Sequence, residues 1–347
     1  MNNFNLDNLI RDNVKRLKPY SSARDEFKDF NQDMVFLDAN ENPINNGVNR
    51  YPDPQQLTVK KVLAEQKGVS IEQILLGNGS DEVLDLLYRA FCEPKVDNVI
   101  TLPPTYGMYN VLAAINTIDN REVLLTDNFQ PNVEAILKHV DKRTKLIFIC
   151  SPNNPTGNAF NSELIEQILK NFDGLVVIDE AYIDFSSQET WLNKLNTYPN
   201  LVVTQTLSKA YGLAGIRLGI CYASAEIIAI LNKIKPPYNV NELTQQRALK
   251  RLVDFNIVES EINTILIQKN ELLKQLHQIK FVKEVYPTDG NFVLVKVDDA
   301  NHRYAQLLEK GIVVRNRTNQ PLCEHCLRFT IGLPQENEKL IKALNEL

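Results

Sequence analysis

One lysine and one arginine are the only charged residues in a segment of small and apolar residues, Thr-Leu-Ser-Lys-Ala-Tyr-Gly-Leu-Ala-Gly-Ile-Arg-Leu-Gly at residues 206–219. A desolvated lysine has a lowered pKa and can form a Schiff base with an aldehyde. The guanidinium of an arginine offers a planar set of donors to a phosphate. A solvated surface loop would carry more charges, so the segment predicts a chemical site around Lys209 and Arg217.

A carboxylate ends one of the most apolar runs of the chain, Val-Val-Ile-Asp-Glu-Ala-Tyr at residues 176–182. Burying a carboxylate at the end of such a strand is costly unless it meets a positive partner. Asp179 could therefore serve a metal, a nucleotide or a protonated ring nitrogen. Capping of a following helix is the structural alternative.

Two polar turns follow predicted strands. Residues 77–82 (Gly-Asn-Gly-Ser-Asp-Glu) open a predicted helix, and free N–H groups at such a place can hold a phosphate. A plain turn capped by Ser80 explains the same residues. Residues 151–157 (Ser-Pro-Asn-Asn-Pro-Thr-Gly) contain turn formers, but two asparagines between prolines are more than a turn requires. A functional and a purely structural role both remain open for this second segment.

Together the four segments contain what pyridoxal phosphate needs from a protein. Lys209 can hold its aldehyde, Asp179 can keep its pyridinium protonated, and Arg217 with the turn at residues 77–82 can hold its phosphate. A protonated ring can accept the electron pair released when a Cα proton leaves. We therefore expect pyridoxal 5'-phosphate as the cofactor.

The elements that must position these groups alternate between short apolar strands and helical patterns. The predicted strands are residues 74–76, 99–102, 146–150, 175–178 and 201–204, and residues 83–91 have helical spacing. Strands that are apolar throughout are buried on both faces, which is typical of a mostly parallel sheet between helices. Ligands in such α/β folds bind at the carboxyl ends of the strands, where the polar segments occur here.

The character of the chain changes after Lys235-Pro236-Pro237. A long amphipathic stretch at residues 242–276 precedes alternating strands at 292–297 and 312–315, with a helix between them. This pattern predicts a smaller α+β domain. We expect an N-terminal arm at residues 1–32, a large domain at 33–235 and the small domain at 236–347.

Composition excludes several classes of protein. The 347 residues carry a mild net charge of −5 without a Lys/Arg block, which argues against nucleic-acid binding. No run approaches the roughly 20 apolar residues that span a bilayer, and the start lacks a signal-peptide pattern. The cysteine count is odd, and Cys92, Cys150 and Cys221 stand in apolar surroundings typical of buried free thiols. A reducing, cytoplasmic setting is expected.

The motifs resemble those of fold-type-I aminotransferases, in particular the histidinol-phosphate aminotransferase family, over nearly the whole chain. Beyond the segments above, the resemblance rests on residues 17–20 (Leu-Lys-Pro-Tyr), 37–43 (Leu-Asp-Ala-Asn-Glu-Asn-Pro), 49–54 (Asn-Arg-Tyr-Pro-Asp-Pro), 104–109 (Pro-Thr-Tyr-Gly-Met-Tyr), 313–316 (Val-Val-Arg-Asn) and 327–332 (Leu-Arg-Phe-Thr-Ile-Gly). The Ser-Lys segment marks the superfamily. Its combination with the Pro-Tyr start, the Arg-Tyr-Pro segment and the two late arginines narrows the resemblance to this family.

The resemblance implies roles around the cofactor ring. Lys209 forms the Schiff base and moves a proton between the substrate's Cα and C4′ of the cofactor. Asp179 pairs with the pyridinium nitrogen. Asn154 and Tyr182 hydrogen-bond the phenolic oxygen, and Tyr106 stacks on the ring.

The resemblance also assigns the cofactor phosphate and implies a homodimer. Backbone groups at Ser80 and Asp81, together with Ser208 and Arg217, hold the phosphate. Tyr51 reaches that phosphate from the other subunit.

For substrates, the resemblance implies that Arg328 binds the carboxylate of glutamate or 2-oxoglutarate. Arg315 and Arg328, helped by Tyr20, take the phosphate of histidinol phosphate. By composition alone, Arg315, Arg317 and Arg328 lie in a polar edge segment for which a solvated face is the usual meaning. Arg328 stands out because Leu327 and Phe329 flank it in an alternating strand.

The reaction expected from the resemblance is the transamination of L-histidinol phosphate with 2-oxoglutarate, giving imidazole-acetol phosphate and L-glutamate, in histidine biosynthesis. A broad-range aromatic aminotransferase and a threonine-phosphate decarboxylase share most of the motifs. A non-catalytic relative would not need Lys209, Asp179 and Arg217 together. A nucleotide-binding α/β protein is disfavoured because residues 77–82 match neither a Walker motif nor a Gly-x-Gly-x-x-Gly fingerprint.

Residues 323–326 (Cys-Glu-His-Cys) have the spacing of half a zinc site. No second pair stands nearby, and the chain has four histidines. We therefore interpret Cys323 and Cys326 as parts of a loop without metal.

Overall fold

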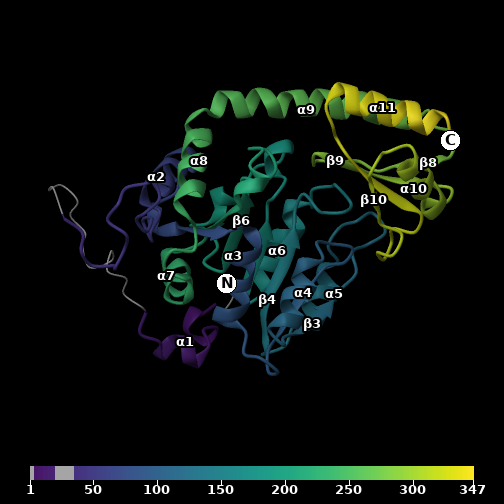
Figure 1. Cartoon of the computed structure of the whole chain (residues 1–347). Coiled ribbons are helices and arrows are strands. Elements are labelled where there is room, and N and C mark those ends of the chain that lie inside the picture. Colours follow the sequence, from purple (N-terminus) through teal and green to yellow (C-terminus); the bar gives the residue numbers. More distant parts are fainter. Residues whose placement is uncertain (1–3, 20–34) are drawn as a thin grey trace.

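The computed structural model describes residues 4–19 and 35–347, and the strands in these residues form two sheets (Figure 1). The larger sheet has the strand order β1-β7-β6-β5-β4-β2-β3. Its strands are β1 (Ile74–Asn78), β2 (Asn98–Thr101), β3 (Asp119–Glu122), β4 (Thr144–Cys150), β5 (Leu175–Asp179), β6 (Leu201–Thr206) and β7 (Leu218–Tyr222). Strands β2 to β6 pair in parallel, and β7 is antiparallel to both β1 and β6. The predicted mostly parallel sheet of an α/β protein is confirmed.

Helices cover both faces of this sheet, because its strands are apolar on both sides. In β4, Ile147 and Ile149 belong to one hydrophobic core, and Leu146 and Phe148 belong to another on the opposite face. The first core includes residues of α2 (Leu57–Lys67), α5 (Val133–His139), α6 (Ser162–Asn171) and α8 (Glu242–Val253). The second includes residues of α1 (Asp12–Arg16), α3 (Ser80–Phe91), α4 (Met108–Ile115) and α7 (Ala225–Ile234).

The smaller sheet is antiparallel in the order β10-β11-β9-β8. Its strands are β8 (Val282–Val285), β9 (Phe292–Val297), β10 (Arg315–Asn316) and β11 (Cys326–Thr330), and its helices are α9 (Phe255–Leu276), α10 (Ala300–Glu309) and α11 (Pro334–Asn345). The long helix α9 runs from α8 to this sheet, beside α11 (Figure 1). Alternate strand residues such as Val293 and Val295 pack in a core with these helices.

The opposite face of the smaller sheet contacts the larger part of the chain. Phe292 and Leu294 of β9 belong to the same core as Tyr182, which follows β5, and the rings of Phe292 and Tyr182 meet edge to face at 5.0 Å. The two sheets therefore meet near the carboxyl ends of the parallel strands. The domain boundaries expected at residues 32 and 235 stay predictions.

Two predicted elements differ from the structure. The amphipathic stretch 242–276 is two helices, because Asp254 leaves helical geometry between α8 and α9 (φ −94°, ψ 43°). The strand predicted at 312–315 is wrong in extent. Gly311 ends α10 with a positive φ of 71°, and the N–H of Ile312 donates to the carbonyl of Leu307. The first residues of the predicted strand, Gly311 and Ile312, therefore belong to the turn that ends the helix. Pairing with β11 begins only at Arg315.

Within the described residues, no helix combines the length and apolar character needed to cross a membrane. Residues 4–19 contain a short 3-10 turn, η1 (Leu6–Asn8), and α1. The N–H of Arg11 donates to the carbonyl of Ala90 at the end of α3, and Val14 is buried. This part of the predicted N-terminal arm therefore packs against the larger part of the chain.

Candidate active site

The order of strands brings the Ser-Lys segment and the glycine turn together. Residues 207–217 connect β6 to its antiparallel neighbour β7, and β7 pairs on its other side with β1. The N–H of Leu207 donates to the carbonyl of Leu218, closing the base of this connection. The N–H of Gly79 donates to the carbonyl of Arg217 over 2.9 Å. The start of α3 and Arg217 are therefore neighbours through backbone pairing.

A cavity lies where the carboxyl ends of β1, β4, β5 and β6 meet, as the strand pattern predicted. Its lining residues are Ser80, Asp81, Tyr106, Cys150, Asn154, Asp179, Ala181, Tyr182, Thr206, Ser208, Lys209, Ala214 and Arg217. Nine of these positions were candidate site residues from the sequence. Arg328 lies beside the cavity through its contact with Asn154, whereas Tyr51 and Arg315 lie outside its lining.

Lys209 lines this cavity, and its side chain is accessible to solvent there. Its ammonium nitrogen lies 5.6 Å from the centre of the Tyr182 ring. Burial lowers the pKa of Lys209, and the nearby positive charge of Arg328 lowers it further. Both effects favour the neutral amine, which is the form that attacks an aldehyde.

Asp179 lies at the end of β5 and is almost fully buried. It accepts hydrogen bonds from the hydroxyl of Tyr109 (2.9 Å) and from the N–H of Ala181 (3.1 Å). Burial raises the pKa of Asp179, and these donors oppose the rise. Among the described residues no cation forms an ion pair with Asp179, so the site holds a carboxylate that lacks a positive partner.

The start of α3 offers backbone donors next to a cation. The N-cap residue Gly79 has a φ of 80° and provides no side-chain cap, so first-turn N–H groups at Ser80 and Asp81 remain for a ligand. A Cβ at Gly79 would meet the Arg217 guanidinium at 2.6 Å, and one at Gly219 would clash with the backbone nitrogen of Ser80. The arginine approaches the turn this closely because both positions lack side chains.

Asn154 links two other polar groups of the site. Its amide nitrogen lies 3.3 Å from the hydroxyl of Tyr182, and its side-chain oxygen accepts a hydrogen bond from Arg328. Burial raises the pKa of Tyr182, whereas Arg328 opposes this effect. Tyr106 stands at the other side of the cavity, where its hydroxyl donates to Asp81 over 3.1 Å.

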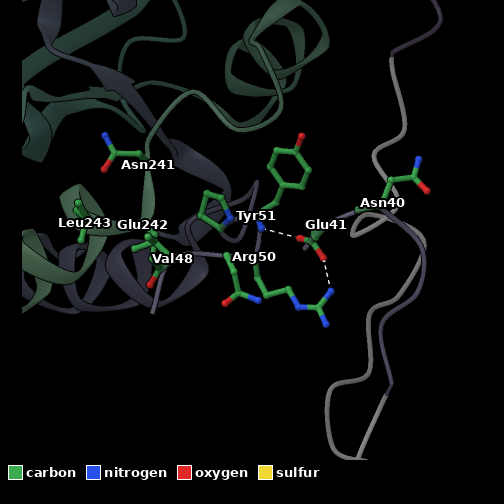
Figure 2. Close-up of a pocket in the computed structure, with 11 residues that line it drawn as sticks. Asn40, Glu41, Val48, Arg50, Tyr51, Asn241, Glu242 and Leu243 are labelled. Atoms are coloured by element: carbon green, nitrogen blue, oxygen red, sulfur yellow. Dashed lines mark hydrogen bonds and ion pairs between the residues drawn. The ribbon is translucent and has the colours of Figure 1, made fainter. Parts of the chain in front are cut away.

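Tyr51 lies in a different hollow, formed by the segment around residues 39–52 and the start of α8 (Figure 2). The carboxylate of Glu41 accepts hydrogen bonds from the N–H of Tyr51 (2.6 Å) and from Arg50 (2.7 Å). The Tyr51 ring is half exposed and stacks on Tyr238 at 4.5 Å. Tyr20, a further candidate, lies outside the described residues.

Arg315 and Arg328 are opposite each other on β10 and β11. Arg328 is mostly buried, with its guanidinium 5.0 Å from the centre of the Phe292 ring, while Arg315 is exposed. Burial lowers the pKa of Arg328 to about 10, and the positive charge of Arg317 is the next largest cause of this decrease.

Sequence reasoning missed Tyr109 as a partner of Asp179 and treated Arg317 as part of a solvated face. Tyr109 lies in the first turn of α4, which begins at Met108, and is three residues after Tyr106 in the same segment. That spacing was the available signal.

The residues present fit pyridoxal phosphate. The buried carboxylate of Asp179 lacks a cation, which a protonated ring nitrogen would supply. The uncapped start of α3 and Arg217 suit a phosphate. Lys209 lines the same cavity, and desolvation lowers its pKa.

All five cysteines are buried, which confirms the apolar surroundings expected for Cys92, Cys150 and Cys221. Cys323 lies in the turn that precedes β11, and Cys326 is the first residue of that strand. In residues 4–19 and 35–347, no group of three or more His, Cys, Asp or Glu side chains is placed to hold a metal ion.

Comparison with known proteins places the chain among similar sequences and folds. The model of the family "Aminotransferase class I and II" matches residues 23–344. The histidinol-phosphate aminotransferase of Flavobacterium johnsoniae is 67% identical, with 100% of each chain covered. The crystal structure of the histidinol-phosphate aminotransferase from Clostridium acetobutylicum has a TM-score of 0.80 and 26% identity over 86% of this chain and 90% of that one. A Sinorhizobium meliloti histidinol-phosphate aminotransferase in complex with pyridoxal-5'-phosphate shares the fold, with a TM-score of 0.78 and 23% identity over 86% of this chain and 82% of that one.

Proposed function

Because the chain belongs to the class I and II aminotransferase family, we propose that it transfers the amino group of L-histidinol phosphate to 2-oxoglutarate. The products are imidazole-acetol phosphate and L-glutamate, and the step belongs to histidine biosynthesis. The observation that carries the proposal is the convergence of Lys209, Asp179 and Arg217 on one cavity. The relative from Flavobacterium johnsoniae, aligned over its full length, supports this substrate.

Pyridoxal 5'-phosphate, when bound, supplies an aldehyde that condenses with amines and a protonated ring that accepts electrons released at the substrate's Cα. Lys209 would hold the aldehyde carbon through its amine and would carry a proton between the substrate's Cα and C4′ of the cofactor. Its lowered pKa supports this role, because a neutral amine can take up a proton. The neighbouring charge of Arg328 helps keep the amine neutral.

Asp179 would hold the proton on the ring nitrogen. A buried carboxylate opposite a pyridinium stabilises the charged ring, since neither group is solvated by bulk water. Asn154 and Tyr182 would donate to the phenolic oxygen from the other side, and Tyr106 would stack on the ring. The half-buried position of Tyr106 in the cavity lining supports that contact.

The phosphate of the cofactor would lie at the start of α3. The N–H groups of Ser80 and Asp81 would donate to it, together with the hydroxyl of Ser208 and the guanidinium of Arg217. Arg217 is half exposed, and its closest carboxylate, Asp81, is 3.7 Å away. This loose pairing leaves the guanidinium available to an anion.

At the substrate end, Arg328 would bind the carboxylate of glutamate or 2-oxoglutarate. Arg328 and Arg315 would bind the phosphate of histidinol phosphate, and Tyr20 is a further candidate for that phosphate. The hydrogen bond between Arg328 and Asn154 supports this assignment, because it places the guanidinium beside the ring-binding residues. Arg315 would extend the same positive surface outward.

We also propose that the enzyme acts as a cytoplasmic homodimer in which Tyr51 reaches the cofactor phosphate of the partner. In its own subunit Tyr51 does not line the cavity around Lys209. The surrounding segment exposes several large apolar side chains: Val35, Leu37, Ile44, Val48 and Leu243. Large apolar side chains left exposed in this way are typical of a face covered by another chain.

The experiment that tests the function is the visible absorption spectrum of the protein loaded with pyridoxal phosphate. Adding L-histidinol phosphate should bleach the band that the cofactor gives when attached to Lys209, and 2-oxoglutarate should restore it. A response to aromatic amino acids but not to histidinol phosphate would replace the substrate with a broader aromatic class. Release of carbon dioxide from threonine phosphate, without glutamate formation, would instead establish a decarboxylase.

A further inference from the structure

A third arginine, Arg317, lies on the same face of the smaller sheet as Arg315 and Arg328. The backbone N–H of Arg317 donates to the carbonyl of Cys326 over 2.9 Å. This bond continues the pairing of β10 with β11 by one residue beyond Asn316. Opposite residues of antiparallel strands share a face, and alternate residues along a strand do so too. The three arginines therefore project from one face of the sheet.

That face is directed toward the candidate active site. On β9, Leu294 pairs with Arg328 and shares its face, and Leu294 belongs to the core that includes Tyr182. Cys326, which pairs with Arg317 on β11, belongs to that core as well. Arg317 thus approaches the cavity from the small sheet.

The guanidinium of Arg317 is only partly exposed, and within residues 4–19 and 35–347 it forms no ion pair with a carboxylate. Its Nε is buried without a hydrogen-bond partner, as is Nε of Arg328. A charged group in this state is costly. Unpaired buried donors at a cavity are the arrangement that an incoming anion would complete.

The positive charges of these arginines also repel one another, which disfavours the charged form of each. Burial lowers the pKa of Arg317, and the charge of Arg315 is the next cause. For Arg328, burial is again first and Arg317 second. Among the ion pairs of the described residues, none joins Arg315, Arg317 or Arg328 to an Asp or Glu side chain. The cluster therefore carries positive charge that the carboxylates of the described residues do not neutralise.

We propose that Arg317 binds the phosphate monoester of the amino substrate, completing a site of three arginines with Arg315 and Arg328. A phosphate monoester carries a charge between about −1.5 and −2 near neutral pH and has three strong acceptor oxygens. It can therefore accept from several guanidinium groups at once, which a single carboxylate does less well. The inference rests on the proposed function, and it makes Arg317 a residue that distinguishes phosphorylated from unphosphorylated substrates.

The test compares Arg317→Gln and Arg317→Lys with the wild-type enzyme, using L-histidinol phosphate and unphosphorylated L-histidinol as amino donors. Loss of a charge-assisted contact should lower kcat/KM for the phosphorylated donor by about ten- to a hundredfold, mainly through KM. The loss for L-histidinol should be at least about tenfold smaller. Arg317→Lys should recover part of the difference, because it restores charge without the planar fork.

Two controls separate a binding role from a structural one. Arg143→Gln changes an exposed arginine at the start of β4, at the opposite end of the strands, and should leave both donors unaffected. Calorimetric binding of L-histidinol phosphate to the cofactor-loaded Lys209→Ala protein, with and without Arg317→Gln, measures affinity without turnover. An equal loss for both donors, or unchanged affinity, would overturn the inference.

The outcome also separates this inference from the proposed function. A wild-type enzyme that does not react with L-histidinol phosphate contradicts the proposed function itself. If the wild type reacts and Arg317→Gln keeps its preference for the phosphorylated donor, only the role of Arg317 is wrong. A larger effect of Arg317→Gln on KM for glutamate than for histidinol phosphate would assign the arginine to the carboxylate of glutamate instead.

Discussion

The hydroxyl of Tyr109 donates a hydrogen bond to Oδ2 of Asp179 over 2.9 Å, and both side chains are buried. Tyr109 stands on α4 and Asp179 ends β5, so the contact joins a helix of one face to the carboxyl end of the sheet. This donor opposes the rise in the pKa of Asp179 that burial causes. Tyr109 thereby helps keep the carboxylate charged and oriented.

Tyr109→Phe should raise the pKa of Asp179 further and weaken its hold on a protonated ring nitrogen. We expect kcat to fall by about ten- to a hundredfold, the range for one lost hydrogen bond to a charged group. The pH dependence of the cofactor absorption band should shift as well, which a purely structural role would not cause. Tyr222→Phe is a matched control, because Tyr222 is equally buried and its hydroxyl has no partner among the described residues. A normal spectrum for Tyr109→Phe would remove this role.

Arg328→Gln should raise the pKa of Lys209, because it removes one of the positive charges that depress it. Only the neutral amine reacts with an aldehyde, so the pH profile for incorporation of pyridoxal phosphate into cofactor-free protein should move to higher pH. Stopped-flow absorption at several pH values measures the shift. Arg89→Gln, on the exposed side of α3, should leave the profile in place. An unchanged profile in Arg328→Gln would mean that burial alone sets the pKa of Lys209.

Gly79→Ala should weaken binding of the cofactor, because the new methyl group would meet the Arg217 guanidinium at 2.6 Å. We expect the dissociation constant for pyridoxal phosphate to rise by at least about tenfold, as expected for loss of a charge-assisted contact. Gly68→Ala is the control, since Gly68 also has a positive φ (66°) but no atom within 4 Å of the added carbon. Equal effects of the two changes would assign the loss to backbone strain and not to displacement of Arg217.

Mixing two inactive variants tests the crossing of Tyr51. If Tyr51 serves the partner's site, a mixed dimer of Tyr51→Ala and Lys209→Ala has one site with both residues intact. Activity after co-refolding should approach about a quarter of the wild-type value, because half of the dimers are mixed and each has one complete site. Light scattering of the same samples reports the dimer. Failure to recover activity in a proven mixed dimer would place Tyr51 in its own subunit's site, or in none.

Several features of the protein follow from local sequence. The runs at residues 146–150 and 175–178 are apolar at every position, which predicts buried parallel strands, and the structure contains β4 and β5 there. The isolation of Lys209 and Arg217 among small apolar residues is enough to mark their segment as a chemical site. These inferences hold because burial of a strand and desolvation of a lone charge are visible within a short stretch of chain.

Other relationships depended on contacts between segments far apart in the sequence. Strand β7 is antiparallel, and only its pairing with β1 brings Gly79 against Arg217. Tyr109 and Arg317 are ordinary residues in their own segments, and their positions beside Asp179 and Arg328 arise from packing of α4 and from pairing of β10 with β11. A local pattern reports whether a side chain is buried, but which partner it meets is determined by long-range pairing of strands and packing of helices.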